Sequence, residues 1–154
     1  MLEVGSKAEN FKLNNQDGEA VSLSDFSGKW VVIYFYPKDS TPGCTKEACG
    51  FELMRIALEQ NNAVILGISR DGQGSHKKFA DNHSLRFNLL SDPDHEVIEA
   101  YGAWVEKSMF GKKYMGISRD TILVNPKGEI HKIYRKVKPD DIATKILEEI
   151  KNGK

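Results

Sequence analysis

The segment Trp30–Tyr36 constrains the fold of this chain more than any other. It is an unbroken run of large β-branched and aromatic residues, and Pro37 ends it. Such a run is typical of a strand that is buried on both faces, as in the centre of an α/β sheet. It is far shorter than the ~20 residues that span a membrane as a helix. The chain therefore predicts a sheet covered on both sides by other elements.

Helical and extended patterns alternate after this strand. A helix is predicted from about Cys44 to Gln60, because Phe51, Met54 and Leu58 recur at helical spacing. A second buried strand is predicted over 63–68. The remaining predicted elements are a helix from an N-cap at Ser75 to Asn82, a short strand at Leu89–Leu90, a short helix at Glu96–Tyr101, strands at Thr121–Val124 and Glu129–Tyr134, and a closing helix at Asp140–Lys151.

Turn signals complete the predicted topology. Residues 11–13 and 20–23 flank an Asp17-Gly18 turn and predict a small N-terminal β-hairpin. The turn at Asn125–Gly128 makes the strands on either side of it antiparallel. No pattern persists between Gly102 and Arg119, so a long ordered loop is expected there. The prediction is an α/β fold with a mixed central sheet, helices on both faces and one domain over residues 1–154.

Composition excludes several classes of function. The chain has 154 residues, with 22 Lys and Arg against 22 Asp and Glu, so its formal net charge is +0. That balance argues against broad binding to nucleic acid or to anionic membranes. The first residues lack the pattern of a signal peptide, and two cysteines are too few for a disulfide scaffold. A cytoplasmic location is therefore expected.

Cys44 occupies the most reactive position that the pattern predicts. It follows the loop after the buried strand, and loops at the carboxyl ends of strands are the usual functional positions in α/β sheets. Thr41 suits an N-cap and Pro42 the first helical position, which places Cys44 in the first turn. Unpaired N–H groups there favour the reactive thiolate. A packing role remains equally open at this point, because free cysteine is also a common core residue.

Cys49 lies five residues further along the same predicted helix. Its spacing from Cys44 differs from the Cys-x-x-Cys of thioredoxin-like dithiols, and two cysteines alone make a poor zinc site. The alternative to a functional second thiol is that a cysteine occurs at position 49 by chance. The histidines show no ligand spacing, so we predict no metal site and interpret each as a surface or core residue: His76, His83, His95 and His131.

The pattern Pro37-x3-Thr41-x2-Cys44 resembles the active-site signature of peroxiredoxins. The longer string from Tyr34 to Cys49 resembles the bacterioferritin-comigratory protein, or Q-type, subfamily. The resemblance continues over nearly the whole chain, through Gly67–Ser69, Leu89–Asp92, Tyr101–Trp104, Glu106–Lys107, Gly111–Lys112 and Gly116–Arg119. It implies a thioredoxin-like fold with an N-terminal extension.

The resemblance also implies a role for each site residue. Cys44 would be the peroxidatic nucleophile and Cys49 the resolving thiol. Thr41 would hydrogen-bond the peroxide oxygens, and Pro37 would shield the pocket from water. Arg119 would pair with the thiolate and polarise the O–O bond, since a fixed cation favours the thiolate and its fork of donors can hold a leaving oxygen.

Three residues depart from the pattern that is usual in the subfamily, and the role of Glu47 has two interpretations. Ser40, Val105 and Asp120 differ from the residues usual in the subfamily, and Asp120 could compete for its neighbour Arg119. Glu47 follows Cys44 by one helical turn. It belongs either to the active-site network or to the solvated surface of the helix, and we favour the solvated surface.

The implied function is a thiol peroxidase that reduces hydrogen peroxide and alkyl hydroperoxides. Cys44 would become a sulfenic acid and then a Cys44–Cys49 disulfide, which a thioredoxin-type dithiol protein would reduce. No metal, haem, flavin or nucleotide is implied, and a monomer is expected. A thiol–disulfide oxidoreductase, a non-catalytic redox sensor and a Cys–His hydrolase are the alternatives, and catalytic turnover of peroxide separates the sensor from the enzyme.

Overall fold

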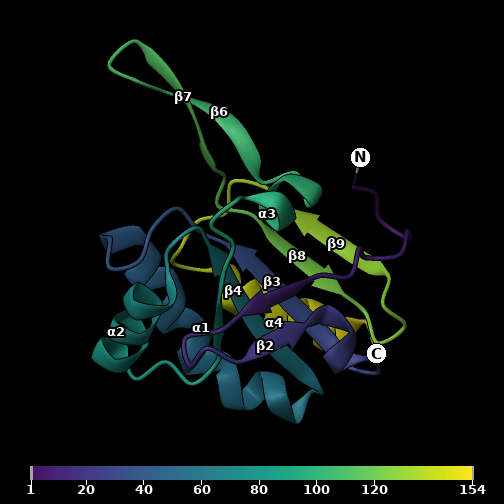
Figure 1. Cartoon of the computed structure of the whole chain (residues 1–154). Coiled ribbons are helices and arrows are strands. Elements are labelled where there is room, and N and C mark those ends of the chain that lie inside the picture. The colour runs from purple at the N-terminus through teal and green to yellow at the C-terminus, as the bar shows by residue number, and fades with distance from the viewer. Residues whose placement is uncertain (1, 154) are drawn as a thin grey trace.

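The computed structural model describes residues 2–153 (Figure 1). Within that range, the main sheet has seven strands in the order β2-β1-β5-β4-β3-β8-β9, and β6 and β7 form a separate two-stranded ribbon. The strands are β1 (Lys12–Asn14), β2 (Ala20–Ser22), β3 (Trp30–Phe35), β4 (Ala63–Ser69), β5 (Asn88–Ser91), β6 (Trp104–Met109), β7 (Lys112–Ile117), β8 (Thr121–Val124) and β9 (Ile130–Tyr134). The helices are η1 (Leu23–Phe26), α1 (Pro42–Gln60), α2 (Gln73–His83), α3 (Glu96–Ala100) and α4 (Ile142–Asn152).

The predicted central strand is confirmed as β3, every residue of which is buried. It pairs in parallel with β4 and antiparallel with β8, so the sheet is mixed as predicted. Alternate side chains of β3 enter two separate cores. Trp30, Val32 and Tyr34 pack with α1 and α4, whereas Val31, Ile33 and Phe35 pack with α3 and the N-terminal elements. Figure 1 shows α4 and α3 on opposite sides of the sheet.

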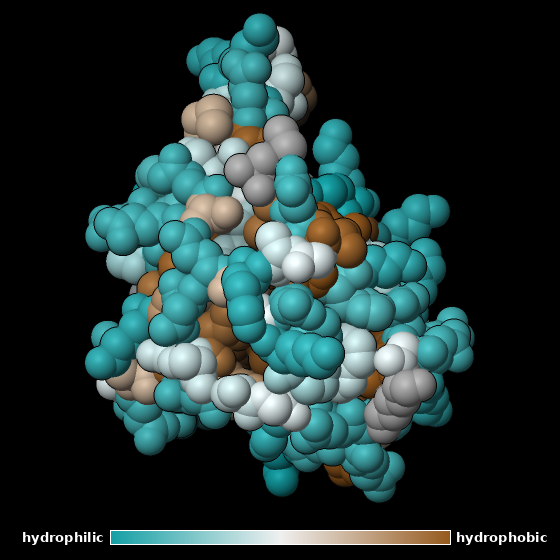
Figure 2. Space-filling model, turned by 90° about the vertical axis from the view of Figure 1, so that its right-hand side faces the viewer, coloured by the Kyte–Doolittle hydropathy of each residue, from teal (hydrophilic) through white to brown (hydrophobic). Residues whose placement is uncertain are grey.

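The loop predicted between Gly102 and Arg119 is wrong, because these residues form the β6–β7 hairpin. Phe110 and Gly111 turn the chain at φ 52° and 79°, as a tight two-residue hairpin turn requires. The hairpin projects from the body (Figures 1 and 2), so both faces of its outer half meet solvent. It therefore lacks the alternation of apolar and polar residues that identifies a half-buried strand in a sequence.

Two predicted helix starts shift slightly. Helix α2 begins at Gln73 after an N-cap at Gly72, because the Ser75 hydroxyl donates to Asp39 Oδ2 (2.8 Å) instead of capping the helix. Helix α4 begins at Ile142, with Asp141 at the N-cap position. Among residues 2–153, no helix is both long and apolar enough to cross a membrane.

Candidate active site

Cys44 lies where the sequence pattern predicts it, at the carboxyl end of β3 and in the first turn of α1. Thr41 is the N-cap, with φ −85° and ψ 153°, and Pro42 is the first helical residue. The thiol of Cys44 is buried, with 1% of the residue exposed, and is free. A buried thiolate at this point needs a compensating positive charge, beyond the helix N-terminus, to be stable.

Arg119 supplies that charge from the segment between β7 and β8. Its Nη2 donates to Cys44 Sγ at 3.4 Å, although the two residues lie 75 positions apart in sequence. Gly43 makes this approach possible, because a Cβ at that position would lie 3.1 Å from Arg119 Nη2. The fold therefore brings together the thiol and the cation that the resemblance singles out.

The favoured interpretation of Glu47 as a solvated residue is wrong. Its side chain is fully buried, and Arg119 Nη1 donates to its Oε1 at 2.8 Å. Burial raises the pKa of Glu47 to about 7, and the Arg119 cation offsets only part of that effect. The other oxygen, Oε2, has no hydrogen-bond partner among the described residues. Helical spacing gave the available signal, because Glu47 lies one turn before the buried Phe51.

Asp120 does not compete for Arg119. Its Oδ2 accepts from Arg135 Nη1 at 2.7 Å, and its Oδ1 accepts from the Ser118 hydroxyl (2.6 Å) and the Lys136 N–H (3.0 Å). These three bonds hold the carboxylate away from the thiol and leave the Arg119 fork to Cys44 and Glu47.

Pro37 and Thr41 lie in the loop between β3 and α1 and precede Cys44 in sequence. The Thr41 hydroxyl donates to the Lys38 carbonyl at 2.8 Å and makes no cap bond to the helix. Its hydrogen is therefore engaged, and its lone pairs remain to accept a hydrogen bond. Pro37 is half-buried, and Ser40, between the two, is in the left-handed region at φ 64°.

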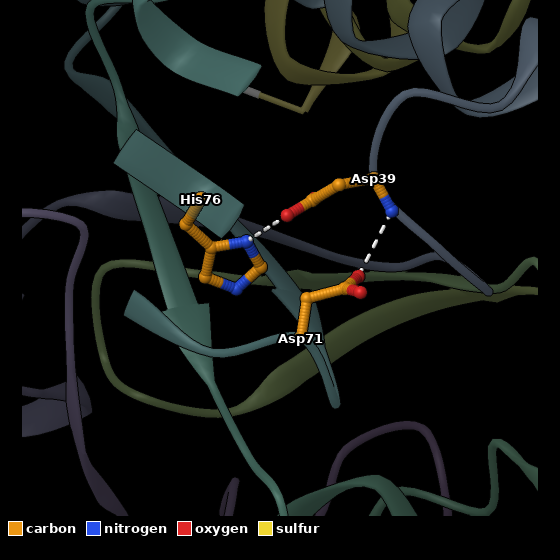
Figure 3. Close-up of side chains that lie close together, drawn as sticks. All are labelled: Asp39, Asp71 and His76. Carbon is orange, nitrogen blue, oxygen red and sulfur yellow. Dashed lines mark hydrogen bonds and ion pairs between the residues drawn. The ribbon is translucent and has the colours of Figure 1, made fainter. Parts of the chain in front are cut away.

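A buried polar cluster anchors the same loop (Figure 3). The sequence did not predict this cluster. Asp39 from the loop lies between Tyr36, Ser75 and His76: the Tyr36 hydroxyl donates to its Oδ1 (2.6 Å), and His76 Nδ1 lies 2.7 Å from its Oδ2. The Asp39 N–H donates to Asp71 Oδ2 at 2.9 Å. The cluster joins the loop to α2 and to the end of β4.

The hydrogen bonds of this cluster define its charges. Burial alone would raise the pKa of Asp39, but hydrogen bonds from His76 and Tyr36 outweigh it and hold that pKa below its usual value. Asp39 is therefore ionised. His76 Nδ1 faces this carboxylate, and its Nε2 faces the Leu90 carbonyl at 3.1 Å, so both ring nitrogens lie against oxygen acceptors. Potential metal-ligating atoms of Asp39, Asp71 and His76 lie within 4.8 Å of one another. Because hydrogen bonds occupy both His76 nitrogens and both Asp39 oxygens, we interpret the cluster as a structural anchor.

A cleft of about 470 Å³ leads to Arg119 beneath the β6–β7 hairpin. Its walls combine the apolar side chains of Val105, Tyr114 and Val137 with the charged side chains of Glu106, Lys107 and Lys136. Burial lowers the pKa of Lys107, and the nearby Arg119 lowers it further. The cleft therefore offers an apolar lining and charges of both signs beside Arg119.

Cys49 lies on the opposite side of α1 from Cys44. It is half-exposed and free. Five residues along an α-helix rotate a side chain by ~140° and raise it by ~7.5 Å, so the Cα atoms of the pair lie ~8.6 Å apart. A disulfide needs Cα atoms within ~7 Å. The intact helix therefore separates the two thiols.

A thioredoxin-like fold in which a half-buried Arg119 donates to the buried Cys44 at a helix N-terminus defines a thiol peroxidase of the peroxiredoxin class. The family model for the AhpC/TSA family matches residues 4–133, and the chain belongs to this family.

Relatives cover nearly the whole chain. Peroxiredoxin Bcp of Bacillus subtilis (strain 168) is 46% identical over 98% of this chain and 96% of its own length. Peroxiredoxin Bcp of Escherichia coli (strain K12) is 44% identical over 93% and 88%. The crystal structure of a cysteine-to-serine mutant of Xylella fastidiosa PrxQ superimposes with a TM-score of 0.95 at 34% identity, covering 99% and 98% of the two chains. The bacterioferritin comigratory protein of Xanthomonas campestris, described for its alkyl peroxide reduction, gives 0.89 at 38% identity, covering 93% and 91%.

Proposed function

We propose that this peroxidase reduces hydrogen peroxide and alkyl hydroperoxides through a cysteine pair. The Cys44 thiolate attacks the terminal oxygen, the O–O bond breaks, and water or an alcohol leaves while Cys44 becomes a sulfenic acid. The Cys49 thiol then displaces water from that sulfenic acid and forms the Cys44–Cys49 disulfide. A thioredoxin-type dithiol protein reduces the disulfide and is itself oxidised. The observation that carries this proposal is the 3.4 Å contact between Arg119 and the buried Cys44 thiol.

Three other residues act on the substrate or its surroundings in this scheme. Arg119 stabilises the thiolate and the negative charge that develops on the leaving oxygen. Thr41 accepts a hydrogen bond from the hydroperoxide, since its own hydrogen is engaged by Lys38. Pro37 keeps water away from the sulfur. Each role is the one that the family resemblance assigns.

The cleft beside Arg119 supports the extension to organic hydroperoxides. The apolar surfaces of Val105, Tyr114 and Val137 suit an alkyl chain, whereas hydrogen peroxide needs no such lining. The alkyl peroxide reduction described for the Xanthomonas campestris relative agrees with this preference.

Formation of the disulfide requires the first turns of α1 to open. Gly50 follows Cys49 directly and lowers the helical stability there by roughly 1 kcal/mol relative to Ala. Opening a helix end costs much less than global unfolding. We further propose that the enzyme works as a cytoplasmic monomer of one domain, without a cofactor and without nucleic-acid or membrane partners, in line with its balanced charge.

Coupled turnover tests the proposal. NADPH oxidation is followed with thioredoxin, its reductase and either hydrogen peroxide or an alkyl hydroperoxide. The unsubstituted protein is expected to turn over many times per chain, and Cys44→Ser to be inactive yet folded by circular dichroism. Retained activity of Cys44→Ser, or a single stoichiometric turnover of the unsubstituted protein, would contradict the assignment.

A further inference from the structure

Two large apolar side chains stand in solvent beside Cys49 on the outer face of α1. Leu53 is 80% exposed and Ile56 is 60% exposed. They follow Cys49 by four and seven residues, so the three side chains fall within a stripe ~60° wide along the helix. We call Cys49, Leu53 and Ile56 the outer stripe.

The outer stripe runs against the pattern of the rest of α1. The opposite face carries Phe51 and Leu58, both fully buried, and a helix that covers a core ordinarily turns polar side chains outward. Among the described residues, the other large exposed apolar side chains are Val4 and four residues of the projecting hairpin. Leu53 and Ile56 are therefore exceptional on the body of the molecule. Adjacent exposed apolar residues of this kind are typical of interaction surfaces.

The surroundings of the outer stripe favour an apolar contact over an electrostatic one. A groove of about 390 Å³ adjoins it, lined by Cys49, Glu52, Leu53 and His83. The charges nearby largely pair with one another: Arg55 bonds Glu52 and Glu59, each at 2.9 Å, and Lys46 lies 3.2 Å from Asp140. The rim is polar and its charges are mostly neutralised, as around the centre of a protein interface.

The redox chemistry requires a partner at this point of the surface. In the reduced protein Cys49 is half-exposed and Cys44 is buried beside Arg119, so we take the Cys49 sulfur as the one that a partner reaches in the proposed Cys44–Cys49 disulfide. Attack on the Cys49 sulfur releases Cys44 as a thiolate, and the Arg119 cation stabilises that leaving group. The second thiol of the reductant then displaces Cys49 and completes its own disulfide. A protein reductant must therefore contact the residues around Cys49.

We propose that the outer stripe is the docking surface for the dithiol protein that reduces this enzyme. The inference rests on the proposed function. It assigns Leu53 and Ile56 to binding of the reductant, with no part in the reaction with peroxide. The partner that fits is a small protein whose reactive dithiol sits in a flat apolar surface, and the mixed disulfide with it forms at Cys49.

The test is the double variant Leu53→Gln/Ile56→Gln, since Gln keeps the helical propensity of the outer face. Steady-state turnover is measured at varied thioredoxin concentration, and in parallel with dithiothreitol as reductant. We expect kcat/KM for thioredoxin to fall by tenfold or more, as when well-packed apolar contacts are lost from an interface. Turnover with dithiothreitol and the single-turnover reaction with peroxide should stay unchanged. Phe110→Gln, at the fully exposed hairpin tip, is the matched control and should keep the original kcat/KM for thioredoxin.

The possible failures are distinguishable. Equal kcat/KM for thioredoxin in the double variant overturns the docking surface and leaves the proposed function intact. A fall in kcat/KM for thioredoxin that is confined to Phe110→Gln also overturns the docking surface. A change in the oligomeric state of the double variant overturns it as well, because it would indicate that a second copy of this chain occupies the outer stripe. If the unsubstituted protein turns over with dithiothreitol but with neither thioredoxin nor glutaredoxin, both the protein reductant and its docking surface are wrong.

Discussion

At the scale of residues, the site is a half-buried arginine that joins two buried side chains, Cys44 and Glu47. The Arg119 guanidinium lies between the Cys44 sulfur and the Glu47 carboxyl, donating through Nη2 to one and through Nη1 to the other. The carboxyl fixes the orientation of the fork, because two bonds in different directions leave the planar guanidinium little freedom. Because burial raises the pKa of Glu47 to about 7, its carboxyl is partly protonated near neutral pH. The protein thereby avoids part of the desolvation free energy of holding two buried anions beside a single cation.

Glu47→Gln is expected to change how stability depends on pH. Because the folded pKa of Glu47 lies above its usual value, the folded state binds more protons than the unfolded state between about pH 4.5 and 7. Glu47 therefore makes folding less favourable as pH rises through this window, by at most ~3 kcal/mol for a shift of this size. Urea unfolding at pH 5 and pH 8 should show Glu47→Gln gaining stability relative to the unsubstituted protein at the higher pH.

Glu148→Gln is the control for this measurement, because Glu148 is exposed on α4. It should follow the unsubstituted protein at both pH values. A parallel pH dependence for the Glu47→Gln and unsubstituted proteins would show that the Glu47 carboxyl stays ionised throughout the window.

The roles of single residues differed in how far the sequence could predict them. Cys44 could be placed at a helix N-terminus because the signals of Thr41 and Pro42 are local. Its contact with Arg119 could not be derived from spacing, since the two meet only through the order of strands in the sheet, and the family resemblance alone suggested it. Glu47 was misjudged because charged residues are rarely fully buried unless paired, and its partner is distant in sequence.

At the scale of elements, the loop before α1 is held by the cluster of Asp39, His76 and Tyr36. This anchoring fixes the loop that leads into Thr41, the N-cap of α1, whereas both thiols lie within the helix. In the proposed cycle this loop can stay in place while the first turns of α1 open.

Asp39→Asn is expected to destabilise the protein at pH 7 by about 1–3 kcal/mol, because it removes the ionised acceptor on which the Tyr36, Ser75 and His76 side chains converge. The folded pKa of Asp39 is depressed, so its stabilising effect is complete above the unfolded pKa of ~3.9 and is lost as pH falls through the lower folded value. Denaturant unfolding between pH 3 and pH 7 should show the difference shrinking in acid. The exposed Asp94→Asn variant should match the unsubstituted protein, and a constant difference for Asp39→Asn across this range would contradict the lowered pKa of Asp39.

Helix α1 must change conformation during the proposed cycle. Both cysteines lie within one continuous helix, on faces that point apart. In protein with a verified Cys44–Cys49 disulfide, we expect faster amide hydrogen exchange across residues 41–50 and less helix by circular dichroism than in the reduced form. Exchange across the later turns, 52–60, should remain slow and serves as the internal control. Equal exchange in both redox states would mean that the bond forms without unwinding.

At the scale of the whole molecule, the sequence predicted the main sheet better than the β6–β7 hairpin that projects from it. The strand at Trp30–Tyr36 and the four-residue turn after β8 were sufficient to predict a mixed sheet with helices on both faces. The β6–β7 hairpin escaped detection because it buries neither face along its outer half, and burial is what creates readable periodicity. That hairpin forms one wall of the cleft beside Arg119 in which we propose that an alkyl hydroperoxide binds. The single-domain organisation stays a prediction.

The most direct test of the account is peptide mapping by mass spectrometry after one equivalent of hydrogen peroxide, under conditions that block free thiols. We expect a monomer in which Cys44 and Cys49 are joined by a disulfide and neither accepts the blocking reagent. A covalent dimer, or a Cys49 thiol that remains free while Cys44 is oxidised, would contradict the intramolecular cycle.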